Sequence, residues 1–302
     1  MTTHSKHSDN VATVGFFDGV HLGHHFLLNR VCEAAKQTGL RSLALTLDRH
    51  PRRVLNQDFQ PKLLNTFSEK IQLLQTSVEH CEVLPFTREL AQMSAADFLE
   101  KILHNTYNVK KLIVGHDHRF GRGRENDFED YCRFAARIGM EIEQTPPFVD
   151  NGVTVSSSVI RRLLDSGDVK AANRYLGYAY TLSGEVVHGN KIGRTIGFPT
   201  ANIVVDNAKL IPKNGVYAVI INIKGRLFDG MLNIGFRPTV AVGEENLCIE
   251  ANIFDFSENI YGENISIKLI ERIRDEQKFD NLDELSQQLL RDKCFTPSFL
   301  RF

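Results

Sequence analysis

The stretch Gly15–His24, GFFDGVHLGH, follows the apolar run Val11–Val14 and precedes a pattern typical of an amphipathic helix. An apolar run, a glycine-rich turn and a helix form the beginning of a βα unit. The histidines His21 and His24 are one helical turn apart, so both imidazoles can face the same pocket. A helix N-terminus offers unpaired N–H groups and a partial positive charge. The stretch therefore predicts an α/β domain with a phosphate site at this turn.

The alternation of strand and helix patterns continues to about residue 177. Further strands are expected at RSLALTLD (41–48), CEVLPF (81–86), KLIVG (111–115) and EIEQTP (141–146). A first helix is expected over HHFLLNRVCEAAKQTG (24–39), which ends at Gly39. Further helices are expected at 67–77, 94–107, 125–139 and 156–177. This alternation predicts a Rossmann-like domain with a parallel sheet. Ligands bind at the carboxyl ends of such strands, where Gly15–His24, Asp48–Pro51 and GHDHRFG (115–121) fall.

The second half of the chain has a different pattern. Short β-rich runs separated by glycine, asparagine and aspartate are found at 181–189, 201–205, 215–225, 226–235, 247–256 and 265–273. They predict a small antiparallel β-barrel, which a helix at 281–292 closes. We expect two domains, residues 1–178 and residues 179–302.

Composition narrows the class of protein. The 302 residues carry 36 Lys and Arg against 37 Asp and Glu, so a broad nucleic-acid surface is not expected. The five cysteines are scattered and form no CxxC pair, which favours a reducing compartment over a disulfide framework. The polar N-terminus and the lack of a long apolar run predict a cytoplasmic protein without a membrane partner. The oligomeric state stays open.

The opening stretch resembles the HxGH signature of the nucleotidylyl transferases. Its longer FDGxHxGH form resembles the N-terminal half of the bifunctional prokaryotic riboflavin kinase/FAD synthetases. The resemblance implies that His21 and His24 contact the phosphates of ATP while FMN attacks the α-phosphorus and pyrophosphate leaves. LTLDRHP (45–51), GHDHRFGRGR (115–124) and SSSVIRRLL (156–164) resemble further segments of that family.

In this first domain the resemblance implies ATP contacts from Gly15, Phe17, Asp18, Gly23, His50, Asp117, Ser157, Ser158 and Arg161. Arginine suits this role because its planar guanidinium donates in a bidentate manner to phosphate. Three positions depart from the family pattern: Phe16, His118 and Ser158.

GEVVHGNKIGRTIGFPTANI (184–203) resembles the signature of riboflavin kinase. The resemblance implies that its glycine-rich loop, with Gly193 and Gly197, wraps ATP, and that Thr200 and Asn202 bind Mg²⁺. Oxygen ligands of this kind suit Mg²⁺. LCIEANIFDF (247–256) resembles the segment that carries the catalytic glutamate, which corresponds to Glu250.

The resemblance therefore implies a bifunctional enzyme of flavin cofactor biosynthesis. Its C-terminal domain would phosphorylate riboflavin with Mg-ATP to give FMN, and its N-terminal domain would adenylylate FMN with ATP to give FAD and pyrophosphate. Its partners would be these small molecules.

Three alternatives remain open. A metal-dependent hydrolase would use the histidines of the pocket loops (His21, His24, His25, His50, His116 and His118), although no HExxH motif occurs. The second alternative is a riboflavin kinase whose first domain is a non-catalytic binding or regulatory module. The third is a flavin sensor or storage protein, for which Glu250, Thr200 and Asn202 would be superfluous.

Overall fold

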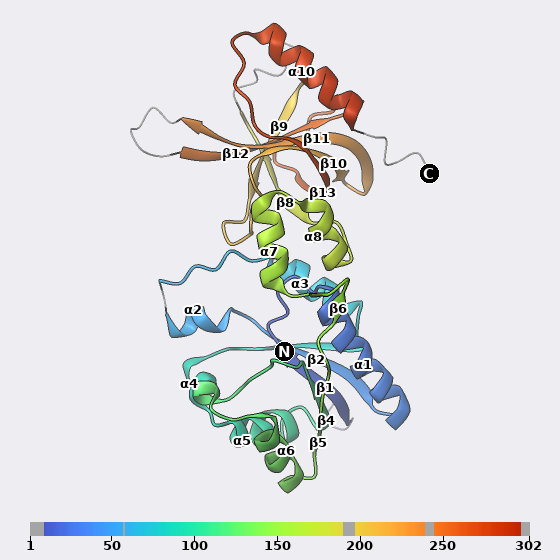
Figure 1. Cartoon of the computed structure of the whole chain (residues 1–302), viewed down its shortest axis with the longest axis vertical. Helices are drawn as coiled ribbons and strands as arrows, with labels where there is room; N and C mark the ends of the chain where they lie inside the picture. The colour runs from blue at the N-terminus through green and yellow to red at the C-terminus, as the bar shows by residue number, and fades with distance from the viewer. Residues whose placement is uncertain (1–8, 57, 190–196, 239–244, 297–302) are drawn as a thin grey trace. The chain divides into compact units, whose positions relative to one another are not determined.

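The computed structural model describes residues 9–56, 58–189, 197–238 and 245–296 (Figure 1). Contacts divide the chain into two compact units, Met1–Ser157 and Ser158–Phe302. Within the described segments no helix is both long and apolar enough to cross a membrane. We describe the two units separately.

The first unit contains a parallel sheet of five strands, as the sequence predicts. They are β1 (Asn10–Gly15), β2 (Arg41–Leu47), β3 (His80–Leu84), β4 (Val109–Val114) and β5 (Glu141–Gln144). Their order is β3-β2-β1-β4-β5, so the chain builds outward from β1 first in one direction and then in the other. The loops that follow β1 and β4 flank this switch point at the carboxyl ends of the strands, where open α/β sheets bind ligands.

Helices cover both faces of this sheet. On one face, α1 (Leu22–Thr38) and α3 (Phe67–Gln75) pack on side chains such as Val11, Ala44 and Ile113. On the other, η1 (Phe98–His104) and α6 (Phe128–Arg137) pack on Leu45, Leu112 and their neighbours. The remaining elements are α2 (Pro51–Leu55), α4 (Arg88–Gln92), α5 (Ala95–Asp97), η2 (Arg122–Arg124) and the hairpin of β6 (Val149–Asp150) with β7 (Val153–Thr154).

Two helix ends show how local sequence sets the limits of the helices. Gly39 ends α1 in the left-handed conformation, with φ of 70° and its N–H bonded to Ala35 O. Ser94 caps the start of α5, where its side chain accepts a hydrogen bond from the N–H of Asp97. The following η1 winds more loosely than an α-helix, since Asn105 N bonds back five residues to Glu100 O.

The second unit is built on a closed antiparallel barrel, which confirms the predicted fold class. Its strands are β8 (Thr181–Val187), β9 (Thr200–Val205), β10 (Gly215–Ile223), β11 (Arg226–Pro238), β12 (Glu245–Ile253) and β13 (Asn264–Arg274), in the order β10-β11-β12-β9-β8-β13. Closure leaves no free sheet edge. The predicted closing helix is α10 (Leu282–Phe295), which contacts β11.

Two helices precede the barrel and pack on it. α7 (Ser157–Ser166) starts at the last residue of the first unit, and α8 (Val169–Leu176) follows. The amide of Asn173 donates to Leu269 O in β13 at 2.8 Å, and the N–H of Lys213 donates to Leu164 O at 2.9 Å. By their contacts these helices therefore belong with the barrel.

Candidate active sites

The two histidines of the opening stretch lie face to face at the start of α1. His21 is the N-cap of α1, and its Nδ1 accepts a hydrogen bond from the backbone N–H of His24 at 3.3 Å. The imidazole rings stack with centroids 3.7 Å apart and an angle of 17° between their planes. Because Nδ1 of His21 is an acceptor, the proton of the neutral ring is on Nε2, which is then a donor.

Burial keeps both rings neutral at pH 7. Desolvation, assisted by the nearby His25, lowers the pKa of His21 to about 4. Desolvation also lowers the pKa of His24 well below its usual value, and the neighbouring His21 and His25 act in the same direction. The pair can donate hydrogen bonds to phosphate oxygens as neutral imidazoles, and the negative charge of a bound phosphate would favour their protonation.

The loop between β1 and α1 is strained and closely packed. Phe17 and Val20 have φ values of 54° and 33°, a conformation that costs free energy in residues other than glycine. A Cβ at Gly23 would come within 3.1 Å of both the His21 ring and the carbonyl oxygen of Val155. Strain of this kind concentrates at ligand sites, which fits a binding role for this loop.

Two of the residues that the resemblance assigns to ATP also have structural partners in their side chains. The Phe17 ring is buried in the apolar core, 5.3 Å from the His24 ring, and a Cβ at Gly15 would meet it at 3.0 Å. The buried carboxylate of Asp18 accepts a hydrogen bond from the N–H of Leu64 at 2.9 Å. A ligand contact from Phe17 would therefore involve its backbone.

His50 and Asp117 lie in the loops that follow β2 and β4. His50 is the N-cap of α2, where its Nδ1 accepts from the N–H of Arg52 at 3.2 Å, and its ring packs edge-on against Phe16 with centroids 5.0 Å apart. Asp117 has a side chain that is 84% exposed. Both loops therefore lie at the carboxyl ends of the parallel strands, where open α/β sheets bind ligands.

The division between the two units falls within the serine motif, after Ser157. The hydroxyl of Ser157, the last residue of the first unit, donates to the carbonyl oxygen of Asp18 in the same unit at 2.8 Å. Ser158 is exposed and Arg161 is half-buried, and both follow on α7 in the second unit.

Paired barrel strands bring together the candidate residues of the second unit. In the antiparallel pair of β9 and β12, Asn202 lies opposite Glu250 and Thr200 lies opposite Asn252. Side chains alternate along a strand, so these four share one face of the sheet. The hydroxyl of Thr200 lies 3.5 Å from Oε2 of Glu250. The amide of Asn252 donates to Pro199 O at 2.8 Å and holds the segment before Thr200.

Cys248 is a member of this group that sequence reasoning missed. Its Sγ lies 3.2 Å from Oε1 of Glu250 and 3.5 Å from Oδ1 of Asn202. It is two residues before Glu250 on β12, so strand alternation places it on the same face and could have indicated it.

The donors in this group fit a hard cation. The hydroxyl of Thr200, the amide oxygen of Asn202 and the carboxylate of Glu250 are oxygen ligands of the kind that Mg²⁺ takes. Among the described residues, no three His, Cys, Asp or Glu side chains gather into a group that could hold a metal ion.

The glycine-rich loop is described only in part. Gly193 lies in the segment 190–196, outside the described residues. Gly197 has a φ of 77°. A Cβ at Gly189 would overlap the side-chain amide of Asn202, so this position admits only glycine while Asn202 keeps its place.

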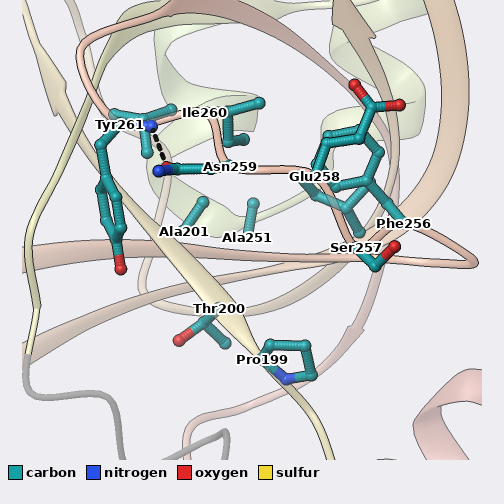
Figure 2. A pocket seen from close by; sticks show the side chains of 12 residues that line it. Pro199, Thr200, Ala201, Ala251, Phe256, Ser257, Glu258, Asn259, Ile260 and Tyr261 are labelled. Carbon is teal, nitrogen blue, oxygen red and sulfur yellow. Dashed lines mark hydrogen bonds between the residues drawn. The ribbon is translucent and has the colours of Figure 1, made fainter.

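Two pockets open beside this group. The first has a volume of ≈ 390 Å³ and lies between the strands and the segment 256–261, which passes over Ala201 and Ala251 (Figure 2). Val186 and Thr200 also line it. In the segment above, the side chain of Asn259 accepts a hydrogen bond from the N–H of Tyr261 at 3.2 Å.

The second pocket has a volume of ≈ 570 Å³ and lies between the barrel and α10. Its wall contains three aromatic rings, those of Phe198, Phe254 and Phe256, together with Gly197 and the cation of Lys293. Pro199, Ile253 and Phe256 line both pockets. The two pockets therefore adjoin at the segment that carries Thr200.

Comparisons with known proteins cover nearly the whole chain. A family model described as FAD synthetase matches residues 3–159, and one described as riboflavin kinase matches residues 176–300. The bifunctional riboflavin kinase/FMN adenylyltransferase of Bacillus subtilis (strain 168) is 36% identical, over 96% of this chain and 94% of its own length. The protein of the same description from Escherichia coli (strain K12) is also 36% identical, over 96% and 92%.

A solved structure shares the fold over the same extent. The crystal structure described as a macrolide-efflux protein from Streptococcus pneumoniae has a TM-score of 0.87 and 33% identity, covering 96% of this chain and 94% of that chain.

Proposed function

This chain belongs to the family of bifunctional riboflavin kinases/FMN adenylyltransferases, and from that premise we propose how its residues divide the two reactions. It is an enzyme that phosphorylates riboflavin to FMN and adenylylates FMN to FAD, with ATP as co-substrate of both steps. The matched segments assign adenylylation to the N-terminal part and phosphorylation to the C-terminal part. The boundary between the adenylyltransferase domain and the kinase domain lies between residues 178 and 179.

For phosphorylation, the observation that carries the assignment is the pairing of β9 with β12. Glu250 accepts the proton of the ribityl 5′-hydroxyl as that oxygen takes the γ-phosphoryl group and ADP leaves. Thr200 and Asn202 would hold Mg²⁺, which neutralises phosphate charge when bound. The separation of 3.5 Å between Thr200 Oγ1 and the Glu250 carboxylate supports a shared site.

The two adjoining pockets suit two substrates. ATP occupies the pocket of ≈ 390 Å³, since Val186 of the glycine-rich stretch and Thr200 line it. Riboflavin occupies the pocket of ≈ 570 Å³, where three phenylalanine rings can pack against a flat aromatic ring system. The phosphoryl group would pass from ATP to riboflavin beside Pro199, which lines both pockets.

For adenylylation, the stacked histidine pair carries the assignment. An FMN phosphate oxygen attacks the α-phosphorus of ATP, and pyrophosphate leaves. Neutral His21 and His24 donate hydrogen bonds to the phosphate oxygens on which negative charge develops. Ser157, Ser158 and Arg161 would contact the triphosphate at the start of α7, and Gly15, Phe17, Asp18, Gly23, His50 and Asp117 would line the nucleotide site with them.

We place the enzyme in the cytoplasm. None of the five cysteines, all of which lie among the described residues, forms a disulfide, and this supports a reducing compartment. A net charge of -1 supports small-molecule partners rather than nucleic acid.

A timed reaction with riboflavin, ATP and Mg²⁺ tests the division of labour. FMN should appear first and then give way to FAD. Glu250→Gln should abolish FMN formation while FMN is still converted to FAD. His24→Ala should slow adenylylation by about 10²-fold or more and leave the kinase intact. Loss of both activities in either folded variant would refute the two-site assignment.

A further inference from the structure

Lys70 is a buried cation that neither reaction, as assigned above, uses. It lies on α3 and is only 3% exposed. Lysine is almost never this buried without a partner, because removing an ammonium group from water is costly. Its Nζ donates a hydrogen bond to the carbonyl oxygen of Leu47 at 2.8 Å.

Two aromatic rings complete the surroundings of this ammonium group. Nζ lies 4.2 Å from the centroid of the Phe16 ring and 5.5 Å from that of Phe67. A cation over an aromatic face is attracted by the ring quadrupole, and the attraction strengthens away from water. The sequence assigns no ligand to Phe16; the structure shows what its ring contacts.

These contacts join α3 to two nucleotide loops. Leu47 is the last residue of β2, directly before the loop that carries His50, and Phe16 is the first residue after β1. The two loops also meet each other. Thr46 Oγ1 donates to Phe16 O at 3.3 Å, and the rings of Phe16 and His50 pack edge to face.

The charged groups around Lys70 come from three elements. Asp18 follows β1, Asp48 follows β2, and Cys81 lies on β3. Burial lowers the pKa of Lys70 to about 8, while Asp18, Cys81 and Asp48 oppose this shift. Burial raises the pKa of the Cys81 thiol to about 11, so the thiol is neutral where Lys70 titrates. The two carboxylates favour the ammonium form. Asp18 accepts a hydrogen bond from the N–H of Leu64, and Asp48 accepts from the N–H of Phe86 and from Arg49.

We propose that Lys70 is a positioning residue for FMN adenylylation, whose ammonium group holds the loops after β1 and β2 in their nucleotide-binding arrangement. It acts through Phe16, Leu47 and His50 and does not touch the substrate. This inference rests on the proposed function of the first unit. Small displacements of substrate-positioning groups are enough to slow a reaction by up to 10²-fold.

The test compares Lys70→Met with Lys36→Met, a substitution of an exposed lysine in the last turn of α1. Methionine keeps most of the aliphatic volume and removes the charge. Adenylyltransferase kcat/KM for ATP should fall about 10- to 100-fold in Lys70→Met and stay unchanged in Lys36→Met. Urea unfolding of the N-terminal unit checks that each variant is folded. Riboflavin kinase activity of the same samples, which belongs to the C-terminal part, checks the protein concentration and should be unchanged in both.

The pH profile separates positioning by charge from simple packing. In the unaltered chain, adenylyltransferase activity should fall as pH rises through about 8, because Lys70 loses its proton there. Lys70→Met should lack this alkaline decline. Phe16→Leu removes the ring that favours the ammonium form, so its decline should move to lower pH by about half a unit or more.

Several results would overturn the inference. One is a folded Lys70→Met chain with the adenylyltransferase kcat/KM and pH profile of the unaltered protein. If the N-terminal unit of Lys70→Met does not fold, an unshifted alkaline decline in Phe16→Leu rejects the inference instead. If the unaltered chain makes no FAD from FMN at any pH, the proposed function fails, and this inference fails with it.

Discussion

The carboxylate of Glu250 has a neighbour at each of its two oxygens. Thr200 lies beside Oε2, and the thiol of Cys248 lies beside Oε1, within reach of Asn202 as well. One group of four side chains on two strands therefore sets the direction in which the carboxylate points.

Removing the thiol should loosen this arrangement. Cys248→Ala should lower riboflavin kinase kcat about 2- to 10-fold, the loss expected for one modest hydrogen bond, while Cys248→Ser keeps a donor and retains more activity. Steady-state kinase assays check this, with adenylylation of FMN measured in parallel and the exposed Cys294→Ala as the matched control. Equal kinase rates in all three variants would contradict a role for the thiol.

The neutral state of His21 has a consequence for stability. Its pKa is about 4 in the folded protein and about 6.5 in the unfolded chain. Below pH 6.5 the unfolded chain takes up a proton that the folded protein does not, so the free energy of unfolding decreases as pH falls toward 4. Between pH 7 and pH 5 this one group should remove about 2 kcal/mol from the N-terminal unit.

His21→Asn tests this directly. Asparagine keeps a side-chain oxygen that can cap α1 but does not titrate. Denaturant unfolding at pH 7 and pH 5 should show a smaller loss of stability in His21→Asn than in the unaltered chain. His80→Asn, at a side chain that is 42% exposed, serves as the control. An undiminished pH dependence in His21→Asn would show that His21 is not the group responsible.

At the scale of elements, one buried ion pair fastens α10 to the barrel. Asp292 on α10 is 2% exposed, and its carboxylate accepts hydrogen bonds from Nε and Nη2 of Arg274 on β13 at 3.0 and 2.8 Å. Gln288 donates to the same carboxylate at 2.9 Å. Because α10 forms one wall of the larger pocket, this pair positions that wall.

Breaking the pair from one side leaves a buried charge without its partner. Arg274→Gln should destabilise the second unit by about 3–5 kcal/mol and raise KM for riboflavin. Hydrogen exchange of the amides in 282–295 should become faster than in the unaltered chain. Arg291→Gln, at an exposed position on the same helix, should change neither. Unchanged protection of α10 in Arg274→Gln would rule out this attachment.

At the scale of the whole molecule, the helices before the barrel decide where a stable fragment can begin. Asn173 bridges the barrel by donating to Leu269 O and accepting from the N–H of Tyr180 at 2.7 Å. Val169, Ala172 and Leu176 of α8 are fully buried. A fragment that lacks α8 therefore exposes an apolar surface of the barrel.

Two fragments make this measurable. The fragment 158–302 should exceed 179–302 in free energy of unfolding by about 5 kcal/mol, from the apolar side chains that α8 buries. Urea denaturation of the two fragments checks the difference, and a riboflavin kinase assay shows whether each is folded. Equal stability would mean that α8 contributes nothing to the barrel unit.

Local sequence determined the architecture of both units and the positions of the candidate motifs. Strand and helix periods, the glycine at the end of α1 and the βα turn at Gly15–His24 depend on residues close together in the chain, so their patterns can be read directly. The stacking of His21 on His24 also follows from a spacing of three residues. These features needed no knowledge of distant contacts.

Tertiary structure alone decided which distant residues meet. The pairing of Glu250 with Asn202 depends on the register of two strands 48 residues apart, and the place of Cys248 follows from it. Lys70 shares a helical face with the buried Leu74, which hints at its burial, but Phe16 and Leu47 come to it only when the sheet forms. The packing of α8 on β13 likewise joins segments about a hundred residues apart, such as Asn173 and Leu269, which are 96 positions apart in the chain. The free energy of the complete fold determines such contacts. A local sequence pattern shows that a face is apolar, but it does not show which distant surface that face packs against.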